Sequence, residues 1–92
     1  EDAIPEEFKL VGNYPNPFNP TTNIKFNLPK ASKVSLSVYN MLGKNITSLV
    51  DKKMSAGSHS VTFDARDLSS GVYLYRISAG DYHEVQKMPL LN

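Results

Sequence analysis

The sequence has 92 residues, with ten Lys and Arg against nine Asp and Glu and a net charge of +1 at pH 7. This length makes one domain and excludes a second, and the near-neutral charge gives no basic surface for nucleic acid or an anionic membrane. Cysteine is absent, which excludes disulfides, thiol catalysis and thiolate metal sites. The sequence also lacks an apolar run of about 18 residues, so we expect no transmembrane segment.

The first seven residues are acidic and are interrupted by Pro5. This composition is typical of an exposed linker, so we expect a linker over residues 1–7 and a folded domain over residues 8–92. The chain begins with Glu1 rather than Met, and no charged and then apolar leader precedes the fold. We therefore expect a piece of a longer protein, with any secretion leader outside it.

A proline-rich stretch follows the first residues that we expect to pack, Phe8, Leu10 and Val11. Each proline fixes its own φ and makes the preceding residue extended, while asparagine side chains can close turns on the nearby backbone. We expect a stiff, ordered loop that Tyr14 and Phe18 attach to the core. The residues of this motif are Asn13, Tyr14, Pro15, Asn16, Pro17, Phe18, Asn19 and Pro20.

Apolar and polar residues alternate over residues 24–28 and again over residues 33–39, which predicts two half-buried strands. Residues 40–43 supply the turn after the second strand, with Gly43 suited to a left-handed conformation. A weaker strand is predicted over residues 46–50, followed by a loop that contains lysines.

A second turn is predicted at Ala56 and Gly57. It leads into a strand in which Val61 and Phe63 point inward. Residues 64–68 then form a corner before the next strand.

Residues 71–80 are the most strand-like stretch, because they are rich in β-branched and aromatic residues and are bounded by glycines. We expect a central strand, with Tyr73, Tyr75 and Ile77 on one face and Arg76 reaching solvent from the other. Tyr73 follows a polar corner. It is therefore the candidate for a tyrosine corner, in which the phenol hydroxyl bonds to backbone a few residues upstream.

The chain ends with a predicted hairpin at Gly80 and Asp81, a strand over residues 82–88, and Pro89, which closes that strand. In all, the sequence predicts about seven short strands separated by turn signals, and no helix. This pattern favours an all-β fold, an immunoglobulin-like antiparallel β-sandwich.

Catalysis is a function class that the sequence argues against. Ser58, His59 and Ser60 are adjacent, but alternation along a strand points His59 away from both serines, and no nucleophile elbow surrounds them. We therefore expect His59 and His83 to be exposed strand residues, and we expect no enzyme activity.

Metal binding has little support in the sequence. Two isolated histidines cannot supply the three or four ligands of a zinc site. Calcium takes oxygen ligands, which Asn16, Asn19, Asp64 and Asp67 could provide, although solvated turns account for the same residues. We expect no metal and no cofactor, with a calcium-binding loop as the open alternative.

Four blocks of the sequence together resemble the C-terminal sorting domain, type A, of proteins exported through the type IX (Por) secretion system. The blocks are residues 13–26, 38–43, 68–76 and 87–91. The resemblance extends over residues 8–92, and it is specific because the four motifs occur in the right order. The family is described as an immunoglobulin-like sandwich, in agreement with the strand pattern.

The resemblance implies a sorting signal instead of an enzyme. Such a domain lies at the C-terminus of an exported cargo protein and directs it from the periplasm across the outer membrane through the translocon. A sortase often removes the domain and attaches the cargo to lipopolysaccharide at the cell surface, and removal here would fall in or before residues 1–8. The residues that the resemblance implies for recognition are Gly71, Tyr73, Lys87, Met88, Leu90 and Leu91.

One departure from the family pattern lies at the last residue, since members commonly end in a basic residue and this sequence ends in Asn92. The apolar and basic terminal strand offers an edge to which a translocon subunit could add by strand pairing. The alternative function is a passive immunoglobulin-like or fibronectin-like accessory module of a secreted hydrolase or adhesin. Removal of residues 87–92 would distinguish the sorting signal from the accessory module. Export would fail for a sorting signal and would continue for a passive module.

Overall fold

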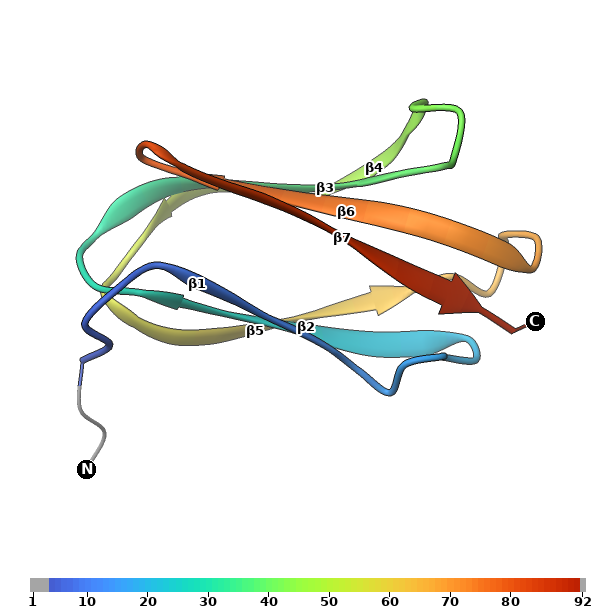
Figure 1. Ribbon diagram of the computed structural model, residues 1–92, viewed down its shortest axis with the longest axis horizontal. Helices are drawn as coiled ribbons and strands as arrows, with labels where there is room; N and C mark the ends of the chain where they lie inside the picture. The colour runs from blue at the N-terminus through green and yellow to red at the C-terminus, as the bar shows by residue number, and fades with distance from the viewer. Residues whose placement is uncertain (1–3, 92) are drawn as a thin grey trace.

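The computed structural model describes residues 4–91, and this part of the chain contains seven strands and no helix. The strands form a three-stranded sheet in the order β1-β2-β5 and a four-stranded sheet in the order β4-β3-β6-β7. The two sheets lie face to face, as Figure 1 shows. The strands are β1 (Lys9–Tyr14), β2 (Thr21–Leu28), β3 (Ser32–Tyr39), β4 (Asn45–Met54), β5 (Gly57–Asp64), β6 (Gly71–Ala79) and β7 (Tyr82–Leu90).

Every neighbouring pair of strands in the two sheets is antiparallel. This architecture confirms the predicted all-β, immunoglobulin-like sandwich. Within residues 4–91 there is no helix with the length and apolar character needed to cross a membrane.

The core lies between the sheets and follows the period-two alternation of the sequence. In β2, the side chains of Ile24, Phe26 and Leu28 are buried, while Lys25 between them is exposed. Alternate burial is expected because each strand of a two-layer sandwich has one covered face. The facing residues of the four-stranded sheet are Val34, Leu36, Val38, Tyr73, Tyr75 and Ile77.

The strand predicted to be central, β6, pairs with β3 on one side and with β7 on the other. The predicted tyrosine corner is confirmed, because the hydroxyl of Tyr73 donates a hydrogen bond of 2.8 Å to the carbonyl oxygen of Ser69. Arg76 reaches solvent as expected. Val72, on the same outward face, is also exposed.

β4 and β7 continue past the C-terminal ends that the sequence predicted for them. β4 continues through Lys52 and Lys53 to Met54, because these residues pair in register with β3. Since β4 is an edge strand, its charged side chains stay in water while its backbone pairs. Pro89 lies within β7, opposite Val72, and does not close the strand. Proline is tolerated there because β7 is the other edge of the sheet.

Two apolar residues that were predicted to pack are exposed. Val11 lies at a register shift between Leu10 and Gly12, and this irregularity of β1 leaves its side chain half in solvent. Tyr14 ends β1 with 78% of its surface exposed, whereas Phe18 is only 1% exposed. The prediction that the loop is attached by an aromatic residue is therefore right for Phe18 and wrong for Tyr14.

Candidate functional site

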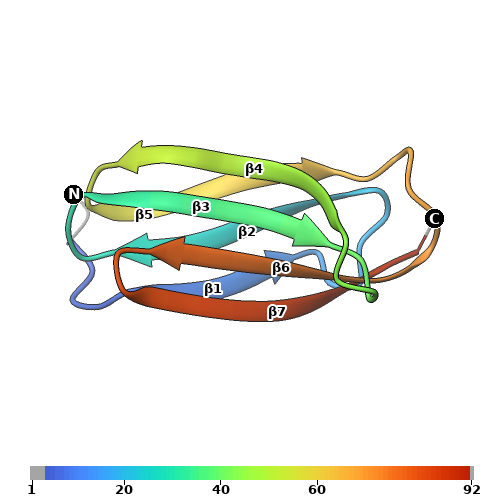
Figure 2. The same ribbon diagram turned by 90° about the horizontal axis from the view of Figure 1, so that it is seen from above.

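Four segments that are far apart in the sequence meet at one end of the sandwich. β1, β3, β5 and β7 end there, and β2, β4 and β6 begin there (Figure 2). The strand register brings the segments together, since Gly71 pairs with Leu90 and Tyr39 pairs with Leu74. We call this region the motif end and define it as residues 13–22, 38–44, 68–76 and 87–91.

The proline-rich loop is attached to the last strand through backbone hydrogen bonds. The N–H of Phe18 donates to the carbonyl of Pro89 at 3.1 Å, and the N–H of Leu91 donates to the carbonyl of Phe18 at 2.9 Å. These bonds form a parallel bridge between Phe18 and Leu90, whose side chains are both buried. The ring of Phe18 also packs against Phe63, with ring centroids 6.0 Å apart. The loop and the C-terminal segment therefore form one structural unit.

Asn13 connects the start of the same loop to β6. Its Oδ1 accepts hydrogen bonds from the hydroxyl of Tyr75 at 3.1 Å and from Nδ2 of Asn16 at 3.2 Å. Its Nδ2 donates to the carbonyl of Pro15 at 3.2 Å. Burial, with the negative charge of Glu84 as the second cause, raises the pKa of Tyr75 to about 12. The phenol therefore keeps its proton at neutral pH and remains a donor to Asn13.

The turn between β3 and β4 is built by the side chain of Asn40. Its Oδ1 accepts hydrogen bonds of 2.9 Å from the backbone N–H groups of both Leu42 and Lys44. Gly43 has a φ of +85°, which confirms the predicted left-handed position. The turn projects Leu42, with 93% of its surface exposed, and Met41, with 57% exposed.

The structure brings all six predicted recognition residues to the motif end but separates them into two groups. Tyr73, Met88 and Leu90 are buried and contribute to the core. The exposed members are Gly71, Lys87 and Leu91. A partner that approaches this end of the folded domain can contact only the second group.

Exposed apolar residues are frequent at the motif end. Most large hydrophobic residues with high exposure belong to it, and the sequence did not identify Met41 or Leu42 as part of a site. Their position in a turn, where no alternation buries them, was the available signal. The exposed apolar residues of the motif end are Tyr14, Met41, Leu42, Val72 and Leu91.

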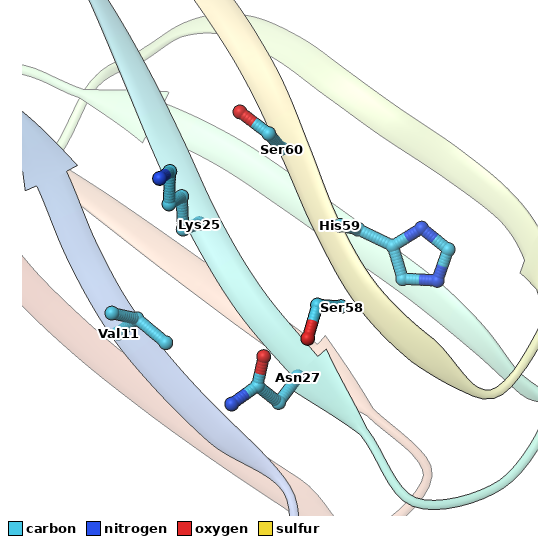
Figure 3. Close-up of a pocket in the computed structure, with 6 residues that line it drawn as sticks. All are labelled: Val11, Lys25, Asn27, Ser58, His59 and Ser60. Carbon is cyan, nitrogen blue, oxygen red and sulfur yellow. The ribbon is translucent and has the colours of Figure 1, made fainter. Parts of the chain in front are cut away.

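A separate pocket lies on the outward face of the three-stranded sheet, lined in part by Lys25, Ser58 and Ser60 (Figure 3). Figure 3 shows both serine side chains on this face and the ring of His59 on the other side of β5. The three side chains do not converge on one point, in agreement with the expected alternation. The arrangement does not build a nucleophile with an adjacent base.

His59 is half-buried, so the prediction of an exposed strand residue is wrong for this histidine. It pairs across the sheet with Phe26, and the two rings stack with centroids 5.5 Å apart. Its Nε2 lies 2.8 Å from the carbonyl oxygen of Ser55. His83, in contrast, is exposed as predicted.

Of the side chains considered for calcium, Asp64 is held in local hydrogen bonds. The carboxylate of Asp64 accepts two hydrogen bonds from Arg66, one from the backbone N–H at 3.0 Å and one from the side-chain Nε at 2.9 Å. The Nη2 atom of Arg66 lies 2.7 Å from Oδ2 of the same carboxylate. These hydrogen bonds lower the pKa of Asp64 and raise the pKa of Arg66. Within residues 4–91, no group of three or more His, Cys, Asp or Glu side chains is placed to hold a metal ion.

The sheet order and the tyrosine corner define a protein of the immunoglobulin-like class, with an exposed end formed by four motifs. Residues 13–90 match the family model described as the secretion system C-terminal sorting domain. The chain belongs to this family, the C-terminal sorting domains of type IX secretion. A search of curated proteins found no match.

Family membership has three consequences. The family is one of sorting signals and is not an enzyme family. A sorting domain interacts with the type IX machinery. Membership of this family also implies export to the cell surface or the extracellular space.

Proposed function

We propose that this domain directs a longer exported protein from the periplasm across the outer membrane through the type IX translocon, and that the machinery reads the motif end of the folded domain. The main support is the meeting of the four motifs at one end, which carries five of the eight exposed large hydrophobic residues in the described part of the chain. Exposed apolar patches on small soluble domains commonly mark interaction surfaces.

The exposed residues are the ones that make contact in this proposal. Leu42, Lys87 and Leu91 offer apolar and basic groups to a partner. Gly71, which pairs with Leu90, has open space where a side chain would lie. Tyr73, like the other buried members of the predicted recognition set, acts indirectly by holding the shape of this end.

We further propose that a sortase cleaves before Phe8 and transfers the cargo to lipopolysaccharide. Ile4, Glu6 and Glu7 are exposed and lie outside the strands, whereas Leu10 is buried and pairs with Phe26. The folded domain would then begin at Phe8, upstream of the family match. Residues 1–3, which belong to the predicted linker, and Asn92 lie outside the described residues.

The test is a fusion of residues 1–92 behind a periplasm-directed fluorescent reporter in a bacterium with type IX machinery. Deletion of residues 87–92 is a poor variant, because it also removes the buried Met88 and Leu90. Leu91→Ser and Leu42→Ser are sharper, since both side chains are exposed. The matched control is Val85→Ser, because Val85 is 52% exposed in the middle of β7 and is not one of the residues that define the motif end.

We expect surface or medium delivery of the intact fusion and of Val85→Ser, and retention of Leu42→Ser and Leu91→Ser in the periplasm. Thermal unfolding of each purified domain separates recognition from folding. Periplasmic retention of the intact, folded fusion would contradict the sorting proposal and favour the passive accessory module. Equal export of all four proteins would show that these exposed residues are not read.

A further inference from the structure

Three of the four edge strands of the sandwich are obstructed. The edges are β1 and β5 in the three-stranded sheet, and β4 and β7 in the four-stranded sheet. A regular, uncovered edge strand is a template for pairing with another chain, so proteins obstruct edges with charges, proline, bulges or covering segments.

β1 and β7 are occupied by contacts with other parts of the chain. The N–H of Leu10 in β1 donates to the hydroxyl of Tyr82 in β7 at 2.9 Å. At the other end of β7, the backbone groups of Pro89 and Leu91 bond to Phe18. The terminal edge, which the sequence predicted for strand addition, is therefore occupied there by the proline-rich loop.

β4 is obstructed by charge and by irregular pairing. Asp51, Lys52 and Lys53 follow one another along the strand, and all three are exposed. The register between β3 and β4 also shifts at two places. Charged side chains and bulges both disfavour the approach of another strand.

β5 has none of these obstructions. It pairs with β2 without a register shift, from Asp64 opposite Thr21 to Gly57 opposite Leu28. Its residues 57–63 include no charged residue and no proline. Figure 2 shows β5 at the rim of its sheet, with β2 as its neighbour within that sheet.

We propose that β5 is an interface for a second copy of this chain, whose own β5 pairs with it antiparallel about a two-fold axis. About such an axis, even-numbered residues of one β5 lie opposite even-numbered residues of the other. Side chains on the outward face of one copy are therefore neighbours of the outward side chains of the second copy. The outward set is Ser58, Ser60 and Thr62, and the inward set is His59, Val61 and Phe63.

The composition of β5 suits a second copy as its occupant. On the outward face, the hydroxyl side chains of one copy would lie opposite hydroxyl side chains of the second copy. The residues are Ser58, Ser60 and Thr62, and cross-strand hydroxyl pairs of this kind are favourable. The sequence of β5 places no like charges opposite each other over residues 57–63, whereas the same pairing of β4 would bring lysines together. The interface is independent of the sorting function.

Sedimentation equilibrium of the 92-residue chain tests the interface, at concentrations up to about 1 mM because one strand pair buries less than a standard interface. The variant is Ser60→Glu, whose carboxylate is accommodated in the monomer by Lys25, its cross-strand neighbour. The control is His83→Glu, an exposed position on the edge strand β7. We expect a concentration-dependent dimer whose dissociation constant rises about tenfold or more in Ser60→Glu and is unchanged in His83→Glu.

Oxidative cross-linking gives a second measurement, because the chain has no cysteine of its own. Ser60→Cys is expected to form a disulfide dimer about tenfold faster than His83→Cys, since pairing raises the local thiol concentration. A wild-type chain that stays monomeric throughout the concentration range would overturn the proposal. So would equal effects of the β5 and β7 variants, or pairing of β5 with a type IX component and never with a second copy.

Discussion

Phe18 and Leu90 lie side by side in a parallel bridge, and each is 1% exposed. The two residues belong to the first and the last of the four motifs. The backbone of Phe18 bonds to the residues on either side of Leu90. The C-terminal segment of this sorting domain therefore has a structural role as well as an exposed surface.

Phe18→Ala should destabilise the domain by about 3–5 kcal/mol, because it removes a buried aromatic ring and leaves a cavity. Urea unfolding followed by circular dichroism measures the change. Tyr14→Ala is the matched control in the same loop, and its exposed ring predicts a change within about 0.5 kcal/mol. Equal losses in the two variants would contradict the assignment of Phe18 as the residue that attaches the loop.

Tyr73→Phe should cost about 1 kcal/mol of stability, because it removes only the hydrogen bond from the phenol hydroxyl to the carbonyl of Ser69. The ring remains in the core, so we expect export to be unchanged. Chemical denaturation and the reporter assay measure the two effects. Loss of export in a stably folded Tyr73→Phe domain would indicate that the hydroxyl has a role beyond the tyrosine corner.

Tyr75→Phe should alter the response of stability to alkaline pH. The folded domain raises the pKa of Tyr75 from 10.0 to about 12, so the fold holds this proton more tightly than the unfolded chain does. The associated stability is fully present below pH 10 and is lost as the pH rises from 10 through about 12. We expect a shallower fall in Tm over this range in Tyr75→Phe than in the wild type.

The control for this titration is Tyr14→Phe, since Tyr14 is exposed at the end of β1. Burial also raises the pKa of Tyr82, and its titration is common to all three proteins. Parallel curves of Tm against pH for the wild type and Tyr75→Phe would refute the prediction.

Asn40→Ala should reduce export more than its effect on stability would suggest. The substitution removes the acceptor for the N–H groups of Leu42 and Lys44, which hold the turn that projects Leu42. We expect a stability loss of about 1 kcal/mol and lower reporter delivery. Asn45→Ala, an exposed asparagine at the start of β4, is the control and should export normally. Normal export of Asn40→Ala would argue against a role for this turn in recognition.

Much of the fold was predictable because alternation along a strand is a local property of the sequence. The buried positions of β2 and β6, the left-handed Gly43 and the tyrosine corner of Tyr73 all followed from patterns of a few residues. The end of β4 was less predictable. Its lysines, at positions 52 and 53, carry no apolar alternation, and only pairing with β3 makes them part of a strand.

The site was only partly predictable, because burial depends on where the chain turns. Tyr14 and Phe18 are both aromatic residues in one proline-rich motif, and no local rule decides which of them enters the core. His59 alternates with two serines as predicted. Its half-burial depends on Phe26, which the register of another strand places beside it.

The sequence by itself determined most of the strand-forming segments, the turns, the absence of cysteine chemistry and, through four ordered motifs, the resemblance to a sorting family. Tertiary structure alone decided that these motifs meet at one end and that Met88 and Leu90 are buried while Lys87 and Leu91 are exposed. The physical reason is that side-chain alternation is set within a strand. Which strands are neighbours, which edges are covered and which apolar residues stay in water are set by the packing of distant segments.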